Sequence, residues 1–188
     1  LVKKREDAAE IFNTQQKRQT DYFDFYLCHA LSHDKLDVYE KEGVYEFLYQ
    51  KKNQGVIRNL GFSFHDTPEV LEMILDKYEW DFVQIQLNYL DWDRQEAKRL
   101  YEILKKRNIP CTVMEPVRGG ALAQLCPEAV EILEKECPGR SPASWALRFA
   151  AGLPGVMTVL SGMSDEAQVK ENINTLVTDF KPLSRSEQ

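Results

Sequence analysis

The sequence lacks the residue spacings that mark several common kinds of site. Its three histidines form no H-x-x-H or H-E-x-x-H pair, its four cysteines form no C-x-x-C pair, and no strand-like run is followed by G-x-G-x-x-G. The first two absences argue against a metal site, and the third argues against an open dinucleotide-binding sheet. Apolar runs long enough to cross a bilayer and a signal peptide are missing too, so we expect no membrane partner.

Positive charge is also in short supply. The chain carries 24 Lys and Arg against 30 Asp and Glu, a net charge of −6, and the basic residues are scattered rather than clustered. Because an acidic protein repels phosphates, we expect no nucleic acid partner. Apolar residues make up 43% of the chain, which is enough for the core of one globular unit. Cys28 and Cys111 lie in apolar runs, as is typical of buried free thiols, and this favours a reducing, cytoplasmic location.

Five apolar runs with strand character alternate with segments of helical periodicity. The predicted strands are 23–30, 56–64, 81–90, 109–117 and 156–163. The predicted helices are 5–19, about 43–55, 66–80, 93–108, 127–136, 141–152 and 164–176, the last with Ser164 as its N-cap. The alternation of strand and helix with short linkers predicts an α/β protein with a parallel sheet.

Polar side chains recur where the predicted strands end. They are His29, Ser63, Gln84, Asn88, Glu115, Arg118, Ser161 and Ser164. Barrels of the (β/α)8 type carry their active sites at the carboxyl ends of their strands, so this pattern favours such a barrel. Five strands are too few to close one, because a closed barrel of this type has about eight. The sequence therefore predicts part of a TIM barrel.

At these strand ends the sequence resembles the aldo-keto reductase family, and it is most similar to a bacterial subgroup of predicted oxidoreductases. The matching runs are "TDYFDFYLCHAL", "GVIRNLGFSFH", "DFVQIQLNYLDW", "VMEPVRGGALA" and "VLSGMSDEAQVKEN", in the order of the family. The resemblance implies an NAD(P)H-dependent oxidoreductase that reduces aldehydes or ketones, which would be its small-molecule substrates. It also implies that 1–188 form a partial barrel domain with the fourth to eighth strands.

The resemblance further implies what this chain would not contain. The first three βα units of the family, with its catalytic aspartate, acid tyrosine and lysine, would precede Leu1. We therefore expect the chain alone to be inactive. Some relatives in the subgroup carry an iron–sulfur segment beyond the barrel, so a cluster is expected only if a C-terminal extension exists.

His29 matches the catalytic histidine of the family at the end of the fourth barrel strand. A neutral imidazole there would donate a hydrogen bond to the carbonyl oxygen as negative charge develops on it. From strand context alone, a hydrogen-bonded core histidine is the simpler interpretation. A metal site made with His33 and His65 is the other alternative, and their spacing argues against it.

The resemblance assigns three residues to the nicotinamide. Ser63 matches the serine of the G-x-S-N motif, although Phe64 replaces its asparagine, and Gln84 matches a glutamine that binds the same carboxamide. Met114 stands where many members stack an aromatic ring on the nicotinamide. Each also has a structural interpretation, as a turn residue, a polar interior residue and a core methionine respectively.

The remaining expected cofactor contacts lie in two segments. The segment at the end of the fourth predicted strand and just after it would pass the pyrophosphate with its backbone and one cation; its residues are Glu115, Pro116, Val117, Arg118 and Gly119. The last segment would hold the adenosine half at a helix N-terminus; its residues are Gly162, Ser164, Gln168 and Asn172. Gly162 and Gln168 occupy positions that are basic in NADP-specific members, and Asp165 adds a negative charge. This favours NAD over NADP.

Two other functions stay open at this stage. The chain could belong to a nicotinamide-binding barrel that no longer catalyses and acts as a regulatory or interaction subunit; an upstream acid tyrosine would favour the enzyme. It could instead be a phosphate-handling barrel of unrelated chemistry, which would need acid–base carboxylates at several strand ends, where only Glu115 qualifies. A partial barrel would also expose two strand edges, so a homo-oligomer is a further expectation.

Overall fold

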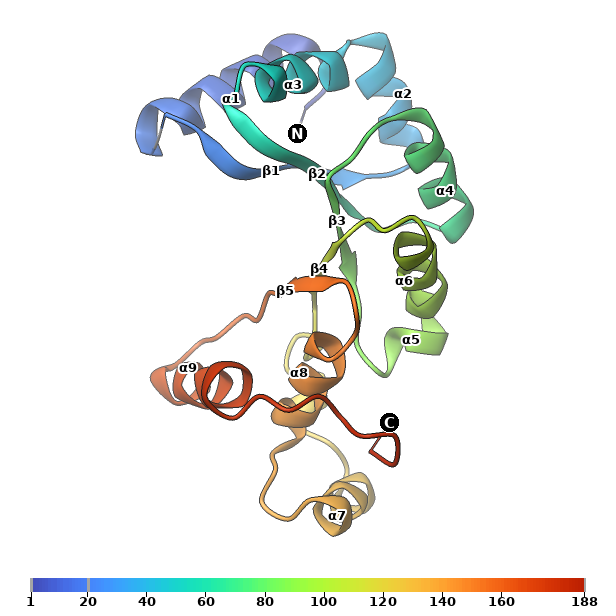
Figure 1. Ribbon diagram of the computed structural model, residues 1–188, viewed down its shortest axis with the longest axis vertical. Coiled ribbons are helices and arrows are strands. Elements are labelled where there is room, and N and C mark those ends of the chain that lie inside the picture. Colours follow the sequence, from blue (N-terminus) through green and yellow to red (C-terminus); the bar gives the residue numbers. More distant parts are fainter. Residues whose placement is uncertain (1, 20, 188) are drawn as a thin grey trace. The chain divides into compact units, whose positions relative to one another are not determined.

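The computed structural model describes residues 2–19 and 21–187 and shows an α/β fold with parallel strands (Figure 1). The hydrogen-bonded strand order follows the chain, β1-β2-β3-β4-β5. The chain divides into two compact units, Leu1–Gln84 and Ile85–Gln188. The α/β class and the parallel sheet that the sequence predicts are thereby confirmed.

The first unit builds helices on a parallel strand pair. Its elements are α1 (Arg5–Gln19), β1 (Phe23–Leu31), α2 (His33–Lys41), α3 (Val44–Asn53), β2 (Ile57–Phe64), α4 (Pro68–Lys77) and the start of β3 (Phe82–Gln86). In Figure 1, α1, α2 and α3 lie on the same side of β1 and β2. The Phe12 ring of α1 is fully buried and meets Phe23, Tyr26 and Phe47. This aromatic cluster packs α1 and α3 against β1, because large rings bury the most apolar area per residue.

The second unit contains the remaining elements. They are α5 (Asp91–Arg94), α6 (Ala97–Lys106), β4 (Cys111–Met114), the 3₁₀ turn η1 (Ala121–Ala123), α7 (Pro127–Glu136), α8 (Pro142–Ala151), β5 (Val156–Val159), α9 (Glu166–Ile173) and the π-turn η2 (Asn174–Thr178). Buried residues of α8, among them Trp145 and Leu147, provide its core. Arg148 is also buried, and its guanidinium donates to the carbonyl oxygen of Lys181, which holds the C-terminal segment against α8.

The structure differs from the sequence prediction at several places. The third and fourth strands end earlier than predicted, at Gln86 and Met114, and Asp91–Arg94 form a short separate helix, α5. The chain forms a separate helix, α2, where the prediction began a helix only at about Gly43. The last strand ends at Val159, so the residues up to Met163 are not extended sheet. The N-cap of α9 is Asp165 and not Ser164, because the Asp165 carboxylate accepts the N–H of Gln168.

Three further observations concern the cysteines, the lengths of the helices and possible metal ligands. Cys28 and Cys111 are buried, Cys126 is exposed, and all four cysteines are free thiols. Within residues 2–19 and 21–187, no helix is both long and apolar enough to cross a membrane. The same residues contain no cluster of three or more His, Cys, Asp or Glu that could hold a metal ion.

Candidate functional site

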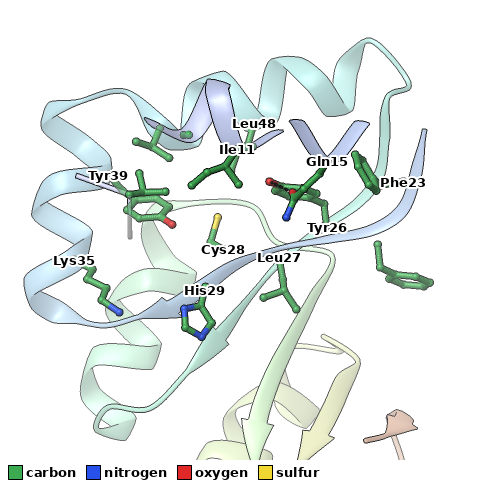
Figure 2. Close-up of a pocket in the computed structure, with 14 residues that line it drawn as sticks. Ile11, Gln15, Phe23, Tyr26, Leu27, Cys28, His29, Lys35, Tyr39 and Leu48 are labelled. Carbon is green, nitrogen blue, oxygen red and sulfur yellow. Dashed lines mark hydrogen bonds between the residues drawn. The ribbon is translucent and has the colours of Figure 1, made fainter. Parts of the chain in front are cut away.

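His29 lies near the carboxyl end of β1, where the pairing with β2 is irregular. Cys28 pairs with Phe62 and Leu31 pairs with Phe64, so His29 and Ala30 together face the single residue Ser63. Two residues opposite one are the arrangement of a β-bulge, which re-aims a side chain at the end of a strand. Figure 2 shows Cys28 pointing toward the helices and His29 pointing to the opposite side of β1. The imidazole is exposed, so the core histidine that strand context allowed is not what the structure contains.

The same region contains a pocket of ≈ 840 Å³ between β1 and the helices α1, α2 and α3. Its walls are mostly apolar, and Figure 2 shows Ile11, Leu48, Phe23 and Leu27 among them.

Burial raises the pKa of the Cys28 thiol to about 12, although a hydrogen bond with Tyr39 acts in the other direction. Cys28 is therefore a protonated core residue at neutral pH and not a nucleophile.

The expected nicotinamide contacts of the first unit are Ser63 and Gln84. Ser63 is only 1% exposed, and its Oγ accepts a hydrogen bond of 2.6 Å from the backbone N–H of Ala30. Gln84 is half-buried on β3. The structure thus brings Ser63 next to the residue that follows His29.

The second unit brings together most of the remaining expected residues. A pocket of ≈ 240 Å³ is lined by eight of them, namely Glu115, Pro116, Val117, Arg118, Gly119, Gly162, Gln168 and Asn172. Met114 and Ser164 do not line this pocket; Met114 is half-buried at the end of β4, and Ser164 is exposed. The loop after β4, the segment before α9 and one face of α9 therefore line one cavity.

The loop after β4 has a backbone that few residues adopt. Glu115, Arg118, Gly119 and Gly120 all have positive φ, and two of the four are not glycine. Positive φ costs energy for residues with a Cβ, so surrounding contacts must hold Glu115 and Arg118 in place.

Asn88 and Asp91, which follow β3, provide those contacts. The Asn88 amide donates to the carbonyl oxygen of Glu115 at 3.0 Å, and the Arg118 Nε donates to Asp91 at 3.1 Å. Asn88 also donates to Asp91 at 2.7 Å, and Asn88 Oδ1 accepts the backbone N–H of Asp91. Asn88 and Asp91 therefore hold both strained positions of the loop.

Asp91 is a buried charged group, with no exposed side-chain surface. Burial acts to raise the pKa of Asp91, but hydrogen bonds from Gln86 and Asn88, together with the Arg118 guanidinium, outweigh it and lower the pKa. Asp91 is thus a carboxylate paired with Arg118 at neutral pH. The sequence analysis did not single it out; the signal is the N-x-x-D spacing after a strand, because an Asn side chain readily accepts the N–H groups that follow it.

Arg118 was expected to pair with the pyrophosphate, and in the structure its Nε already has a carboxylate partner. Its side chain is 37% exposed, so the rest of the guanidinium can still reach a ligand. A guanidinium has five N–H donors, and one ionic contact leaves donors for an anion.

The segment before α9 and one face of α9 form the other wall of this pocket. Gln168 Oε1 accepts the N–H of Ser164 at 2.8 Å, and Asn172 donates to Ser161 Oγ at 3.1 Å. Glu171 also lines the pocket and accepts a hydrogen bond from the Ser141 hydroxyl. Glu171 adds a carboxylate that the sequence analysis did not include.

Two solved structures share the fold of this chain. The aldo-keto reductase AKR11C1 from Bacillus halodurans, in its holo form, superimposes with a TM-score of 0.79 at 24% identity, over 100% of this chain and 66% of that chain. An aldo-keto reductase from Klebsiella pneumoniae, solved in complex with NADPH, gives a TM-score of 0.69 at 21% identity, over 94% of this chain and 60% of that chain.

One curated protein and one family model are also similar in sequence to this chain. L-galactose dehydrogenase from Arabidopsis thaliana is 22% identical over 92% of this chain, which spans 58% of the length of that protein. The sequence model of the Aldo/keto reductase family matches residues 3–187. Because this match covers nearly the whole chain, the protein belongs to the aldo/keto reductase family.

Proposed function

We propose that the protein is a nicotinamide-dependent oxidoreductase that reduces aldehydes or ketones. The observation that supports this most is the ≈ 240 Å³ pocket of the second unit, because eight residues that the resemblance assigns to the cofactor line it. Their chemistry fits a dinucleotide. A Cβ added at Gly120 or Gly162 would meet no atom within 4 Å, so the backbone there is open to close approach by a ligand.

The residue roles follow from the chemistry of carbonyl reduction. Bound NAD(P)H would supply the hydride. His29 would donate a hydrogen bond to the carbonyl oxygen and orient the substrate. Ser63 and Gln84 would bind the carboxamide and Met114 would lie against the nicotinamide ring, while the loop 115–119 would hold the pyrophosphate. Gly162, Ser164, Gln168 and Asn172 would hold the adenosine half.

We also propose that this chain supplies the fourth to eighth strands of a (β/α)8 barrel. Two observations support the proposal. The chain spans 66% of AKR11C1 and 58% of L-galactose dehydrogenase. The ≈ 840 Å³ pocket leaves apolar side chains of α1, α3 and β1 without close cover, and further βα units would bury them. A reducing, cytoplasmic location fits the two buried thiols.

The decisive experiment for the function compares the 188-residue chain with the full-length protein in a steady-state assay. We expect the full-length protein to oxidise NADH or NADPH in the presence of reactive aldehydes. The chain alone should give negligible turnover, because the acid tyrosine of the family would lie in the preceding units. A full-length protein that binds the cofactor but turns over no carbonyl would instead point to a regulatory subunit.

The charges in the second pocket support a preference for NAD. Among the described residues that line it, Arg118 is the only Lys or Arg, and Glu115 and Glu171 contribute carboxylates. Because Arg118 is already paired with Asp91, a 2′-phosphate would meet more negative than positive charge. We therefore propose tighter binding of NAD than of NADP.

Replacing Gly162 with lysine should raise NADP affinity. Nothing lies within 4 Å of the added Cβ, so the new ammonium is free to approach a 2′-phosphate. A charge-assisted hydrogen bond contributes about 1.5–3 kcal/mol, so we expect roughly a tenfold or larger gain for NADP with little change for NAD. Fluorescence titration of both cofactors measures it. Val169→Lys is the matched control, because Val169 lies on α9, a few residues after Gly162, but does not line the pocket; equal gains from both variants would contradict the placement.

A further inference from the structure

The β-bulge at His29 depends on a backbone conformation that its own sequence does not favour. Ala30 has φ 50°, in the left-handed region, and it is not glycine or asparagine. An alanine reaches this region only at a cost in conformational energy, so a contact from elsewhere must hold it. Because Ala30 follows His29 directly, whatever holds Ala30 also fixes the backbone on the C-terminal side of His29.

Ser63 on β2 makes that contact. The Ala30 N–H donates to Ser63 Oγ at 2.6 Å, between residues 33 positions apart in the chain. In regular alternation with Phe23, whose N–H donates to Val56, the N–H of Ala30 would point away from β2, and at the bulge it turns toward β2 instead. Ser63 is 1% exposed between Phe62 and Phe64, which are buried as well, so its hydroxyl sits in a rigid part of β2.

We infer that Ser63 is a positioning residue for His29, in addition to any contact it makes with the cofactor. The inference rests on the proposed function, in which His29 orients the carbonyl. By accepting the Ala30 N–H, the Ser63 hydroxyl links the bulge of β1 to β2 and fixes the left-handed residue directly after His29. Figure 2 shows the imidazole on the side of β1 opposite to Cys28.

A serine suits this position because its hydroxyl can accept and donate at once. The oxygen accepts from Ala30, and its proton stays available for another acceptor. In the proposed site that acceptor is the carboxamide oxygen of the nicotinamide. The Ser63 hydroxyl then links the cofactor to the backbone N–H of Ala30, the residue next to His29.

The first test uses the cofactor-free protein labelled with ¹³C-histidine. With only three histidines in this chain, the His29 signal is assigned by comparison with His29→Gln. We expect Ser63→Ala to shift or broaden the ring signal of His29 while that of His33 stays in place. Ser63→Thr keeps the hydroxyl and should restore the His29 signal. If Ser63→Ala does not fold, Ser63→Cys preserves the shape and offers only a weak acceptor.

The second test measures turnover of the full-length protein at saturating cofactor. We expect Ser63→Ala to lower the rate about 10- to 100-fold, the range for a small misplacement of a catalytic group, and Ser63→Thr to recover most of it. Thr112→Val is the control, since Thr112 is another buried strand hydroxyl, on β4.

An unchanged His29 signal in Ser63→Ala would overturn the inference, as would an equal response to Thr112→Val. If the full-length protein reduced no carbonyl, the proposed function would fail. The histidine signals of the cofactor-free protein would still decide whether Ser63 orients His29.

Discussion

Replacing His29 with alanine is expected to lower the turnover of the full-length protein about 10²- to 10³-fold, the usual loss when a preorganised donor to a developing oxyanion is removed. The affinity for the cofactor should change little. The reason is that different residues are involved: His29 is exposed in the bulge of β1, whereas residues of the second unit line the pocket with the expected adenosine and pyrophosphate contacts. Steady-state turnover and fluorescence titration of the cofactor on the same samples separate the two effects.

His33→Ala is the matched control for this experiment. His33 is an exposed histidine at the start of α2, and its ring lies near Asp34, so its loss removes an imidazole of similar exposure outside the proposed chemistry. We expect near-normal turnover from this variant. A rate that survives in His29→Ala, or a loss confined to cofactor binding, would show that β1 does not carry the catalytic histidine.

The strands were predictable because their apolar runs are long and their ends are polar. The run that leads to His29 predicted β1 to within one residue, and the alternation of strand and helix predicted the parallel sheet. The bulge was not predictable. Nothing in "CHAL" signals a left-handed residue, since glycine or asparagine usually occupies that conformation. Ala30 adopts it because of Ser63, 33 residues away, and a contact at that separation leaves no local pattern.

In the candidate site, too, some features were predictable from the sequence, and others depend on contacts between distant residues. The resemblance predicted cofactor contacts in the loop 115–119 and in the segment from Gly162 to Asn172, and residues of both segments line one cavity in the structure. The resemblance did not show that Asp91 pairs with Arg118. From the sequence, Arg118 is a cation available for phosphate. Only the fold shows that its guanidinium also pairs with the buried carboxylate of Asp91. The cofactor roles of these residues stay predictions until binding is measured.

Replacing Asp91 with asparagine is expected to lower both stability and cofactor affinity. Asp91 accepts from Gln86, Asn88 and Arg118, and the substitution removes the charge that all three donors face. Removing one member of a buried ion pair typically costs about 3–5 kcal/mol, and we expect the lower part of that range because Arg118 can turn to solvent. The loop 115–119 then loses the anchor for its strained Arg118, so cofactor binding should weaken with it. Chemical denaturation and cofactor titration measure the two losses.

The acid dependence of stability distinguishes this ion pair from a general packing defect. The pKa of Asp91 is lowered in the folded protein, so the carboxylate contributes stability above its unfolded pKa of about 3.9 and loses it as the pH falls through the folded value. The free energies of unfolding of the wild type and Asp91→Asn should therefore differ at pH 7 and converge below about pH 4. Asp93→Asn, an exposed neighbour on α5, should match the wild type throughout. A difference between the wild type and Asp91→Asn that stays constant down to low pH would mean that the charge of Asp91 is not what holds the loop.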